Sequence, residues 1–380
     1  MKILIAIDSM KGSLSSAAAG EAARRGCLTA APAAEVTVLR LADGGEGTVR
    51  ALAGEDATLV TATVTGPLGA PTVAEYAILA DKTAVIEMAA AAGLPLLRPE
   101  ERNPLYTTTY GVGELIADAL SRGCRRYLIG IGGSATCDGG AGMLQALGFG
   151  LFDQSGNPIA RGAHGLLSLH TVDTSRVPQE LFESNFHVAC DVRNPLCGAH
   201  GAAAVFAPQK GARPEDIPTL DAALAHFAAV VAEARGEDLS GVAGAGAAGG
   251  LGFALLTLLC ARLSPGVETV IDMIGLREAL RDTDLVLTGE GRLDGQTAFG
   301  KAPVGVARAA KERGIPVVAI GGSVSEDAAP LHECGIDACF PIIDSPCTLT
   351  EAMDGTRAKK NIERTAREIT RLYLAAHQVK

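Results

Sequence analysis

The stretch Leu128–Met143, LIGIGGSATCDGGAGM, joins an apolar run to a glycine-rich segment and then to a helix-like run. Residues 127–131 are typical of a buried β-strand, whereas residues 132–140 carry almost no bulky side chain. A strand that turns through glycines into a helix exposes several backbone N–H groups, and the helix start adds partial positive charge. Three polar side chains lie in the same segment: Ser134, Thr136 and Asp138. We therefore predict that this loop binds an anion, and that the anion is phosphate.

The composition favours a two-domain protein that acts on a small molecule. The chain has 380 residues, which exceeds one ordinary core. Its net charge of −10 repels nucleic acid and anionic membrane surfaces. Tryptophan is absent and aromatic residues make up only 4%, so surfaces on which single-stranded bases could stack are few. We expect neither nucleic acid nor a membrane as a partner.

The cysteines and the N-terminus indicate a cytoplasmic protein. The nine cysteines include no C-x-x-C pair, which is typical of reduced thiols. The first apolar run spans only residues 3–7, too short for a signal peptide, and no run approaches the ~18 apolar residues of a membrane span. We expect a monomer or a small homo-oligomer.

Apolar runs alternate with helix-like runs at both ends of the chain. Residues 2–7 and 35–41 are typical of buried parallel strands, and the same rhythm returns from residue 284. Between these ends, residues 59–64 and 73–79 alternate apolar and polar positions, which predicts antiparallel strands.

This pattern predicts an α/β fold of two α/β domains. A parallel-sheet domain is built from both chain ends, residues 1–64 plus 281–380. A mixed α/β domain, residues 65–280, is inserted into it and carries the glycine-rich loop.

Three polar loops follow three of the predicted parallel strands: Asp8–Ser13, Asp43–Gly47 and Glu290–Asp294. Ligands of open parallel sheets bind beyond the carboxyl ends of the strands. Carboxylates at such an edge hold Mg²⁺ or act as bases, and Lys11 and Arg292 suit a phosphate or a substrate carboxylate. The alternative is that these residues only cap helices and form tight turns, but three such loops on one edge favour a site.

Two further segments have features of nucleotide-binding motifs. Gly295–Lys301 fits G-x-x-x-x-G-K, yet Ala302 stands where a P-loop has Ser or Thr, so only phosphate neutralisation by Lys301 is expected. Gly130–Ala135 fits the dinucleotide fingerprint G-x-G-x-x-A, although residues 136–140 separate it from the helix.

Cys190–Leu196, CDVRNPL, ends a predicted strand with a carboxylate, a guanidinium and an amide. Asp191 could accept a proton from a substrate hydroxyl, as the base of a phosphoryl transfer. The alternative is that Asp191 and Asn194 stabilise a turn before Pro195. Neither a zinc-binding His pair nor a G-x-S-x-G elbow is present, so a zinc site and a serine hydrolase are not expected.

Together these stretches resemble the bacterial type I glycerate kinase family. The matching stretches run in the family's order and span nearly the whole chain: residues 8–13, 42–48, 130–142, 191–195, 208–211, 244–252 and 288–301. Met10 stands where the family usually has an aromatic residue. The resemblance implies ATP-dependent phosphorylation of D-glycerate, generally at the 2-hydroxyl, with the 3-hydroxyl as the other possibility. It also implies a flavodoxin- or Rossmann-like domain, an inserted domain and an active site in the cleft.

The motifs and the resemblance assign roles to individual residues. The catalytic residues are expected to be Asp191, as the base, Lys11 and Arg292. ATP is expected to contact Gly132, Gly133, Ser134, Thr136 and Lys301. Glycerate is expected to contact Asp8, Ser9, Asn194 and Glu290. Mg²⁺ is carried mainly by the nucleotide, with possible contacts from Asp43, Asp294 and Glu290.

Two other functions stay open at this point. The dinucleotide fingerprint is compatible with a nicotinamide-dependent hydroxy-acid dehydrogenase. A non-catalytic sensor of an organic acid is the third possibility. Glycerate-dependent ATP consumption separates the kinase from both.

Overall fold

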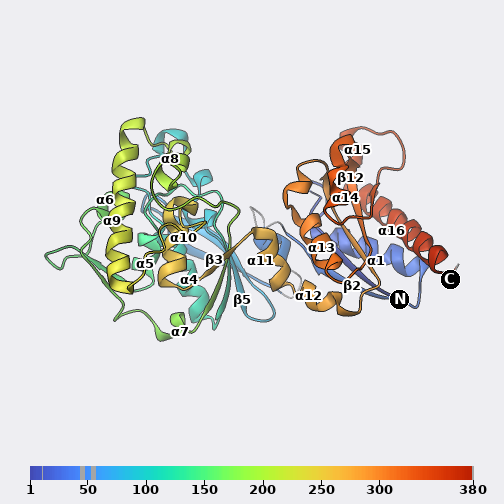
Figure 1. Cartoon of the computed structure of the whole chain (residues 1–380), viewed down its shortest axis with the longest axis horizontal. Coiled ribbons are helices and arrows are strands. Elements are labelled where there is room, and N and C mark those ends of the chain that lie inside the picture. Colours follow the sequence, from blue (N-terminus) through green and yellow to red (C-terminus); the bar gives the residue numbers. More distant parts are fainter. Residues whose placement is uncertain (11, 43–47, 53–56, 379–380) are drawn as a thin grey trace. The chain divides into compact units, whose positions relative to one another are not determined.

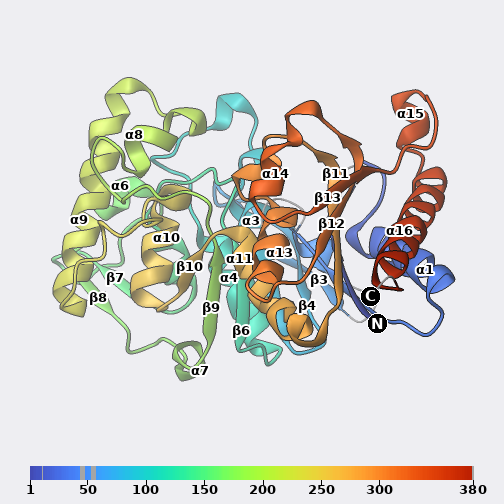
Figure 2. The same cartoon turned by 45° about the vertical axis from the view of Figure 1, so that its right-hand side comes forward.

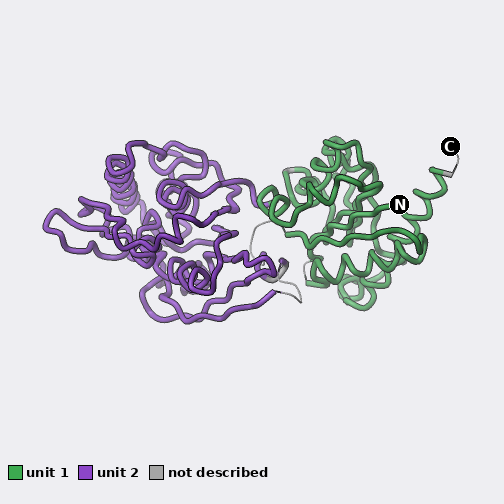
Figure 3. Tube along the Cα trace, turned by 90° about the horizontal axis from the view of Figure 1, so that it is seen from below, with its two compact units in different colours: residues 1–43, 267–380 green, residues 44–266 purple. Residues whose placement is uncertain are grey.

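The computed structural model describes residues 1–10, 12–42, 48–52 and 57–378 (Figure 1). The chain forms two compact units (Figure 3): unit 1 is residues 1–43 with 267–380, and unit 2 is residues 44–266. These limits differ from the predicted boundaries after residues 64 and 280.

Pairing of neighbouring strands accounts for the difference at the first boundary. Strand β3 (Thr58–Thr65), placed at the end of the first domain by the sequence, pairs with β4 (Pro71–Ile78) in the sheet of unit 2. The alternating runs therefore form one antiparallel hairpin, as predicted.

Unit 1 is built on a five-stranded sheet in which every strand pair is parallel. Its strands, in spatial order, are β13 (Ala338–Pro341), β12 (Val317–Val324), β11 (Leu285–Leu293), β1 (Lys2–Ile7) and β2 (Glu35–Arg40). Counted along unit 1, this order is 2-1-3-4-5, the flavodoxin-like order. The predicted parallel sheet made from both chain ends is confirmed.

Helices cover both faces of this sheet. On one face, Ile3, Ile5 and Ile7 belong to a core shared with α1 (Ser16–Ala30) and α16 (Gly355–Gln378), which lie side by side (Figure 2). On the other face Leu4 is equally buried, and α13 (Ala302–Lys311) packs against β11 and β12. Burial on both faces explains why the strands read as continuous apolar runs.

Strand β11 is longer than the sequence indicates. Glu290–Asp294 was expected as a loop after the strand, but β11 continues to Leu293. The extension is paired, because Arg292 and Leu293 lie opposite Ser323 and Val324 of β12. Neighbour pairing, rather than local composition, sets the end of the strand.

Unit 2 contains a six-stranded mixed sheet. Its strands, in spatial order, are β10 (Arg262–Ser264), β9 (Asn185–Ala189), β6 (Arg126–Gly130), β5 (Thr83–Glu87), β4 and β3. The first four are parallel, and β4 and β3 are antiparallel. Its helices are α2 (Thr48–Leu52), α3 (Ala89–Ala92), α4 (Tyr110–Ser121), α5 (Ala141–Ala146), α6 (Ala163–Leu166), α7 (Gln179–Phe182), α8 (Ala202–Phe206), α9 (Ile217–Arg235) and α10 (Ala247–Leu258).

Other short elements are the antiparallel pair β7 (Gly150–Phe152) and β8 (Thr171–Asp173), and the helices α11 (Gly266–Met273), α12 (Leu276–Ala279), α14 (Pro330–Glu333) and α15 (Leu349–Ala352).

One helical segment of the described residues, Pro214–Arg235, is long and apolar enough by length and composition to cross a membrane. Its side chains Leu220, Leu224 and Phe227 are fully buried in the core of unit 2. Many of its other positions are exposed or half-buried, so the segment packs one face on the core of unit 2.

Close packing of α1 on α16 gives a stability test. A Cβ added to Gly26 would lie 2.1 Å from the backbone oxygen of Glu363. We expect Gly26→Ala to lower the free energy of unfolding by about 1–3 kcal/mol, although alanine is the better helix former. Urea unfolding measures the change, and Gly241→Ala, which adds a Cβ with no atom within 4 Å, is the control. A Gly26→Ala protein as stable as the wild type would contradict this packing.

Candidate functional site

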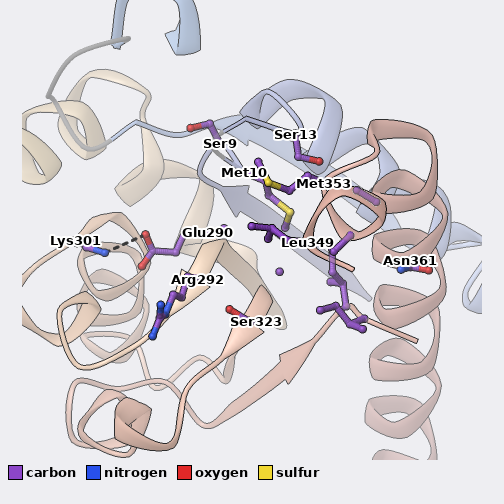
Figure 4. Close-up of a pocket in the computed structure, with 16 residues that line it drawn as sticks. Ser9, Met10, Ser13, Glu290, Arg292, Lys301, Ser323, Leu349, Met353 and Asn361 are labelled. Carbon is purple, nitrogen blue, oxygen red and sulfur yellow. Dashed lines mark ion pairs between the residues drawn. The ribbon is translucent and has the colours of Figure 1, made fainter. Parts of the chain in front are cut away.

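Unit 1 has a cavity at the topological switch point of its sheet. The strand order reverses between β1 and β11, and ligands of open α/β sheets bind at the carboxyl ends of such strands. A cavity of about 450 Å³ lies there, between the segment after β1 and the end of β11 (Figure 4). We call it the unit 1 cavity. Ser9, Met10, Glu290, Arg292 and Lys301 are among its lining residues.

A network of charged side chains occupies one end of the unit 1 cavity. Lys301 Nζ lies 3.6 Å from a Glu290 oxygen and 4.0 Å from an Asp294 oxygen, and Arg292 Nε lies 3.3 Å from Asp294. The Thr297 hydroxyl donates to Glu290 at 2.6 Å. Burial raises the pKa of the Glu290 carboxyl, and the Thr297 hydroxyl and the Lys301 ammonium act in the opposite direction. Arg292 and Lys301, two of the predicted phosphate-binding cations, therefore already have a carboxylate partner.

The described acidic residues of unit 1 do not form a metal cage. Asp294 accepts hydrogen bonds from the backbone N–H groups of Gln296 and Thr297 and pairs with Arg292, so its oxygens stabilise a turn. Within the described ranges, no three His, Cys, Asp or Glu side chains converge as metal ligands. Asp43 lies outside the described residues.

The segment after β1 contributes Ser9, Met10 and Ser13 to the unit 1 cavity, whereas Asp8 is not among the lining residues. Asp8 is buried, and its Oδ1 accepts a hydrogen bond from the Ser9 N–H at 2.6 Å. The Ser16 hydroxyl fixes this edge of the sheet, since it donates to Ile7 and accepts from the Leu41 N–H. Lys11 lies outside the described residues.

Unit 2 has its own cavity, of about 350 Å³, at the carboxyl ends of β6 and β9. We call it the unit 2 cavity. The glycine-rich loop after β6 contributes Gly132, Gly133 and Ser134, and the segment after β9 contributes Asp191. Four residues that were expected to meet substrate or nucleotide thus surround one space.

The glycine-rich loop is held from its buried side by the carboxylate of Asp138. This side chain is fully buried and accepts hydrogen bonds from the N–H and hydroxyl groups of Thr109, at 2.8 and 2.9 Å. It also accepts from the N–H groups of Gly140 and Gly142, at 3.2 Å each. Gly140, the N-cap residue before α5, has a φ of 81°, a left-handed conformation that glycine adopts without strain. Asp138 therefore fixes the shape of the loop and does not line the unit 2 cavity.

A buried lysine that the sequence did not single out forms part of the same cavity. Lys210 is only 2% exposed, and its Nζ donates to Ser134 Oγ and to the Thr136 carbonyl, both at 2.7 Å. Among the described residues no carboxylate lies within ion-pair distance, and the third N–H of the ammonium has no acceptor. Burial lowers the pKa of Lys210 to about 8.

Asp191 and Asn194 have different environments. Asp191 is exposed, and its Oδ1 accepts a hydrogen bond from the Gly266 N–H at 2.9 Å, which orients the carboxylate. Asn194 does not line the unit 2 cavity, because its amide donates to the His200 carbonyl at 2.8 Å. The Asn194 side chain thus bridges to the segment after Pro195.

Thr136 also differs from its expected role. Its side chain is fully buried, its hydroxyl has no hydrogen-bond partner among the described residues, and only its carbonyl contacts Lys210. The dinucleotide fingerprint, Gly130–Ala135, does not open directly into a helix, because α5 begins only at Ala141. In the sequence, Lys210 lies in Pro208–Gly211, PQKG, which is one of the stretches that carry the family resemblance. That resemblance assigned no role to Lys210.

Comparisons with known proteins match nearly the whole chain to one family. A family model described as the glycerate kinase family matches residues 3–374. Glycerate kinase of Bacillus subtilis is 49% identical, and the alignment covers 97% of each chain. Glycerate 2-kinase of Escherichia coli is 48% identical, with 97% of each chain covered. The crystal structure of a putative glycerate kinase 2 from Salmonella typhimurium has a TM-score of 0.88 at 47% identity, and covers 100% of this chain and 99% of its own.

Proposed function

The chain belongs to the glycerate kinase family, and from this premise we propose that it transfers the terminal phosphoryl group of ATP to the 2-hydroxyl of D-glycerate. The products are ADP and 2-phosphoglycerate. The 2-hydroxyl is chosen because one relative, 48% identical, is named glycerate 2-kinase. The nine cysteines are all free, which supports a cytoplasmic enzyme. A monomer or a small homo-oligomer stays our expectation.

The composition of the unit 2 cavity carries this proposal. Phosphoryl transfer needs a base for the attacking hydroxyl, donors for the phosphoryl oxygens and neutralisation of charge. The unit 2 cavity brings together the Asp191 carboxylate, the backbone of Gly132 and Gly133, and the Lys210 ammonium with Ser134. All three requirements are therefore met by side chains and backbone groups around one space.

Asp191 is the proposed base. The Gly266 N–H occupies Oδ1, and Oδ2 has no partner in the described part of the chain, so Oδ2 is available to accept the proton of the glycerate hydroxyl. A carboxylate that is exposed and lines the cavity can reach a substrate without rearrangement of the core.

Lys210 and the glycine-rich loop are the proposed phosphate-binding groups. A buried ammonium attracts an anion strongly because little water screens its charge. Gly132 and Gly133 leave the backbone open to phosphate oxygens, and the Ser134 hydroxyl, oriented by Lys210, adds a donor.

The remaining assignments concern unit 1. Arg292, which is largely exposed, can turn from Asp294 to a substrate carboxylate, and Ser9, Asp8 and Glu290 stay proposed as glycerate contacts. Among the described residues the donor set does not fit a protein-held Mg²⁺, because Asp294 is already paired with cations. We keep the proposal that Mg²⁺ enters with ATP, whose charge it neutralises.

Product analysis tests the reaction and its regiochemistry. With ATP and D-glycerate we expect ADP and a single phosphomonoester in the phosphorus NMR spectrum. Its signal is a doublet if the 2-hydroxyl reacted, because one proton sits on that carbon, and a triplet if the 3-hydroxyl reacted. L-Glycerate and a glycerate-free sample are the controls. ATP loss that is independent of glycerate, or glycerate-dependent reduction of a nicotinamide cofactor, would overturn the proposal.

Removal of the proposed base tests the role of Asp191. We expect Asp191→Asn to lower kcat by about 10²–10⁴, while the affinity for ATP in calorimetry stays within a few-fold of the wild type. Asp238→Asn is the matched control, because Asp238 is an exposed carboxylate of unit 2 that also accepts a backbone N–H. Near-normal turnover of Asp191→Asn would exclude Asp191 as the base.

The pKa of Lys210 gives a pH test. Lys210 is charged below a pH of about 8 and loses its proton above it, so kcat/KM for ATP should fall as the pH rises through that value. The neighbouring Cys137 thiol has its pKa raised by burial to about 11, so it stays protonated in this range. We expect Lys210→Met to lower kcat/KM and to remove this alkaline limb. An unchanged limb in Lys210→Met would assign it to another group.

A further inference from the structure

Among the described strands, β3 forms one edge of the unit 2 sheet and is paired on one side only. It has eight residues, TLVTATVT, and it is the last strand in the spatial order of the sheet. Its register with β4 is unbroken, from Thr58 opposite Ile78 to Thr65 opposite Pro71. The side of β3 that faces away from β4 therefore presents a row of backbone donors and acceptors.

The alternation of the antiparallel ladder identifies these outward groups. The Gly66 N–H donates to the Ala70 carbonyl at 2.7 Å, so these two residues form a hydrogen-bonded pair at the turn. Counted back in steps of two, the even-numbered residues of β3 bond to β4, and Leu59, Thr61 and Thr63 direct their N–H and C=O groups outward. Within the described part of the chain these outward groups form no hydrogen bond.

Glu114 closes the end of this edge that lies nearest the turn. Thr65 is the next outward-facing residue, and its N–H donates to the Glu114 carboxylate. This contact agrees with the direction of the alternation and limits the open edge to residues 59–63. Leu59, Thr61 and Thr63 are all exposed, so no other described residue covers their backbone.

The other edges of the two large sheets carry features that usually prevent pairing with a second chain. At the opposite edge of the unit 2 sheet, β10 has three residues and includes Arg262. In unit 1, β13 has four residues and ends in Pro341, and β2 begins with Glu35 and ends with Arg40. Short length, charge and proline all discourage association at an edge. β3 differs from these strands, because it is long and has neither a charged residue nor a proline.

The exposed side chains of β3 suit a second copy of the same strand. Antiparallel pairing centred on Thr61 places this residue opposite its counterpart, and Leu59 opposite Thr63 of the second copy. Thr–Thr pairs and pairs of an aliphatic with a β-branched side chain stabilise such a contact. Val73 lies beside Thr63 on β4, so Leu59, which is 50% exposed, and Val73, which is 66% exposed, both gain apolar neighbours.

Charge does not oppose this pairing, although the whole chain carries a net charge of −10. Residues 58–65 are all uncharged. The carboxylate of Glu75 lies opposite Thr61 on β4. In the paired sheets it is three strand spacings, about 14 Å, from its counterpart, which exceeds the Debye length of about 8 Å at physiological ionic strength.

We propose that a second copy of this chain pairs with β3 in antiparallel orientation about a two-fold axis at Thr61, so that the two unit 2 sheets form one continuous sheet. In this dimer residues 59, 61 and 63 exchange N–H···O bonds with residues 63, 61 and 59 of the second copy. A contact of one surface with itself closes after two copies and leaves no open β3 edge. Residues 58–65 line neither cavity, so the dimer is independent of the proposed kinase function.

Sedimentation of the full chain tests the dimer. Stable interfaces have dissociation constants from micromolar to picomolar, so at about 50 µM we expect the wild type to sediment as a dimer. Thr61→Pro should weaken the dimer about tenfold or more, because the ring removes an outward N–H from both copies. Its own ladder with β4 keeps every bond, since that N–H faces away from β4.

Thr61→Val is the matched control, because it keeps the N–H and the β-branched shape, and it should stay dimeric. A wild type that is monomeric at about 50 µM, a concentration that populates micromolar interfaces, would overturn the proposal. A folded Thr61→Pro protein as dimeric as the wild type would do the same.

A second variant keeps the test decisive if thermal unfolding shows that Thr61→Pro does not fold. Thr61→Lys places two ammonium groups opposite each other across the two-fold axis, so it should weaken the dimer, and added salt should restore part of the loss. Thr171→Lys makes the same change at an exposed residue of β8 and should leave the dimer intact. A dimer that Thr61→Lys does not weaken contradicts the pairing.

Cross-linking separates this pairing from any other dimer. The Cα atoms of a hydrogen-bonded antiparallel pair lie about 5.5 Å apart, which a disulfide can span. Thr61→Cys should therefore give a disulfide-linked dimer after treatment with diamide. Leu59→Cys, which is also exposed, should not, because Thr63 of the second copy lies opposite it. The wild type is the blank for the nine native cysteines. Absence of a cross-link through Thr61→Cys would exclude the proposed axis.

Discussion

Parallel strands place all of their carboxyl ends on one edge of a sheet, and both cavities of this chain depend on that constraint. In unit 1 the strand order 2-1-3-4-5 reverses direction between β1 and β11, and the cavity lies at this topological switch point. In unit 2 the parallel strands β6 and β9 end side by side, so the glycine-rich loop and Asp191 meet although they are far apart in the sequence. The direction of the strands thus sets where the ligand-binding groups lie, whatever their side chains are.

Two buried charges in unit 2 illustrate how hydrogen bonding separates a structural role from a chemical one. Burial raises the pKa of Asp138, and the four hydrogen bonds that it accepts from the surrounding loop and helix starts act against this rise and satisfy its oxygens within the protein. Lys210 has two acceptors, both neutral, and lines a cavity. A buried ammonium in that state is costly unless an anion completes its shell. Asp138 thus fixes the shape of the loop, whereas Lys210 is suited to bind an anion beside it.

Unit 1 shows the converse arrangement, in which opposite charges already satisfy one another. Four side chains form a connected set of ion pairs: Glu290, Lys301, Asp294 and Arg292. Each cation of this set therefore has a carboxylate partner, and each carboxylate has a cation. Such a network can exchange one partner for a ligand of the same charge at modest cost, whereas a divalent metal would have to displace Lys301 and Arg292.

The sequence by itself determined the parallel sheet from both chain ends, the antiparallel hairpin of β3 and β4, the glycine-rich loop and the family, since each rests on a local pattern of apolar and glycine residues. It did not determine where β11 ends, which side of the loop Asp138 and Thr136 face, or that Lys210 is buried. These depend on neighbours that are distant in the chain: Lys210 meets Ser134 across 76 positions, and β11 is extended by its pairing with β12. Local periodicity reports which positions are apolar, but only the packed tertiary structure decides which polar groups are buried, and with which partners, because their burial is set by other segments.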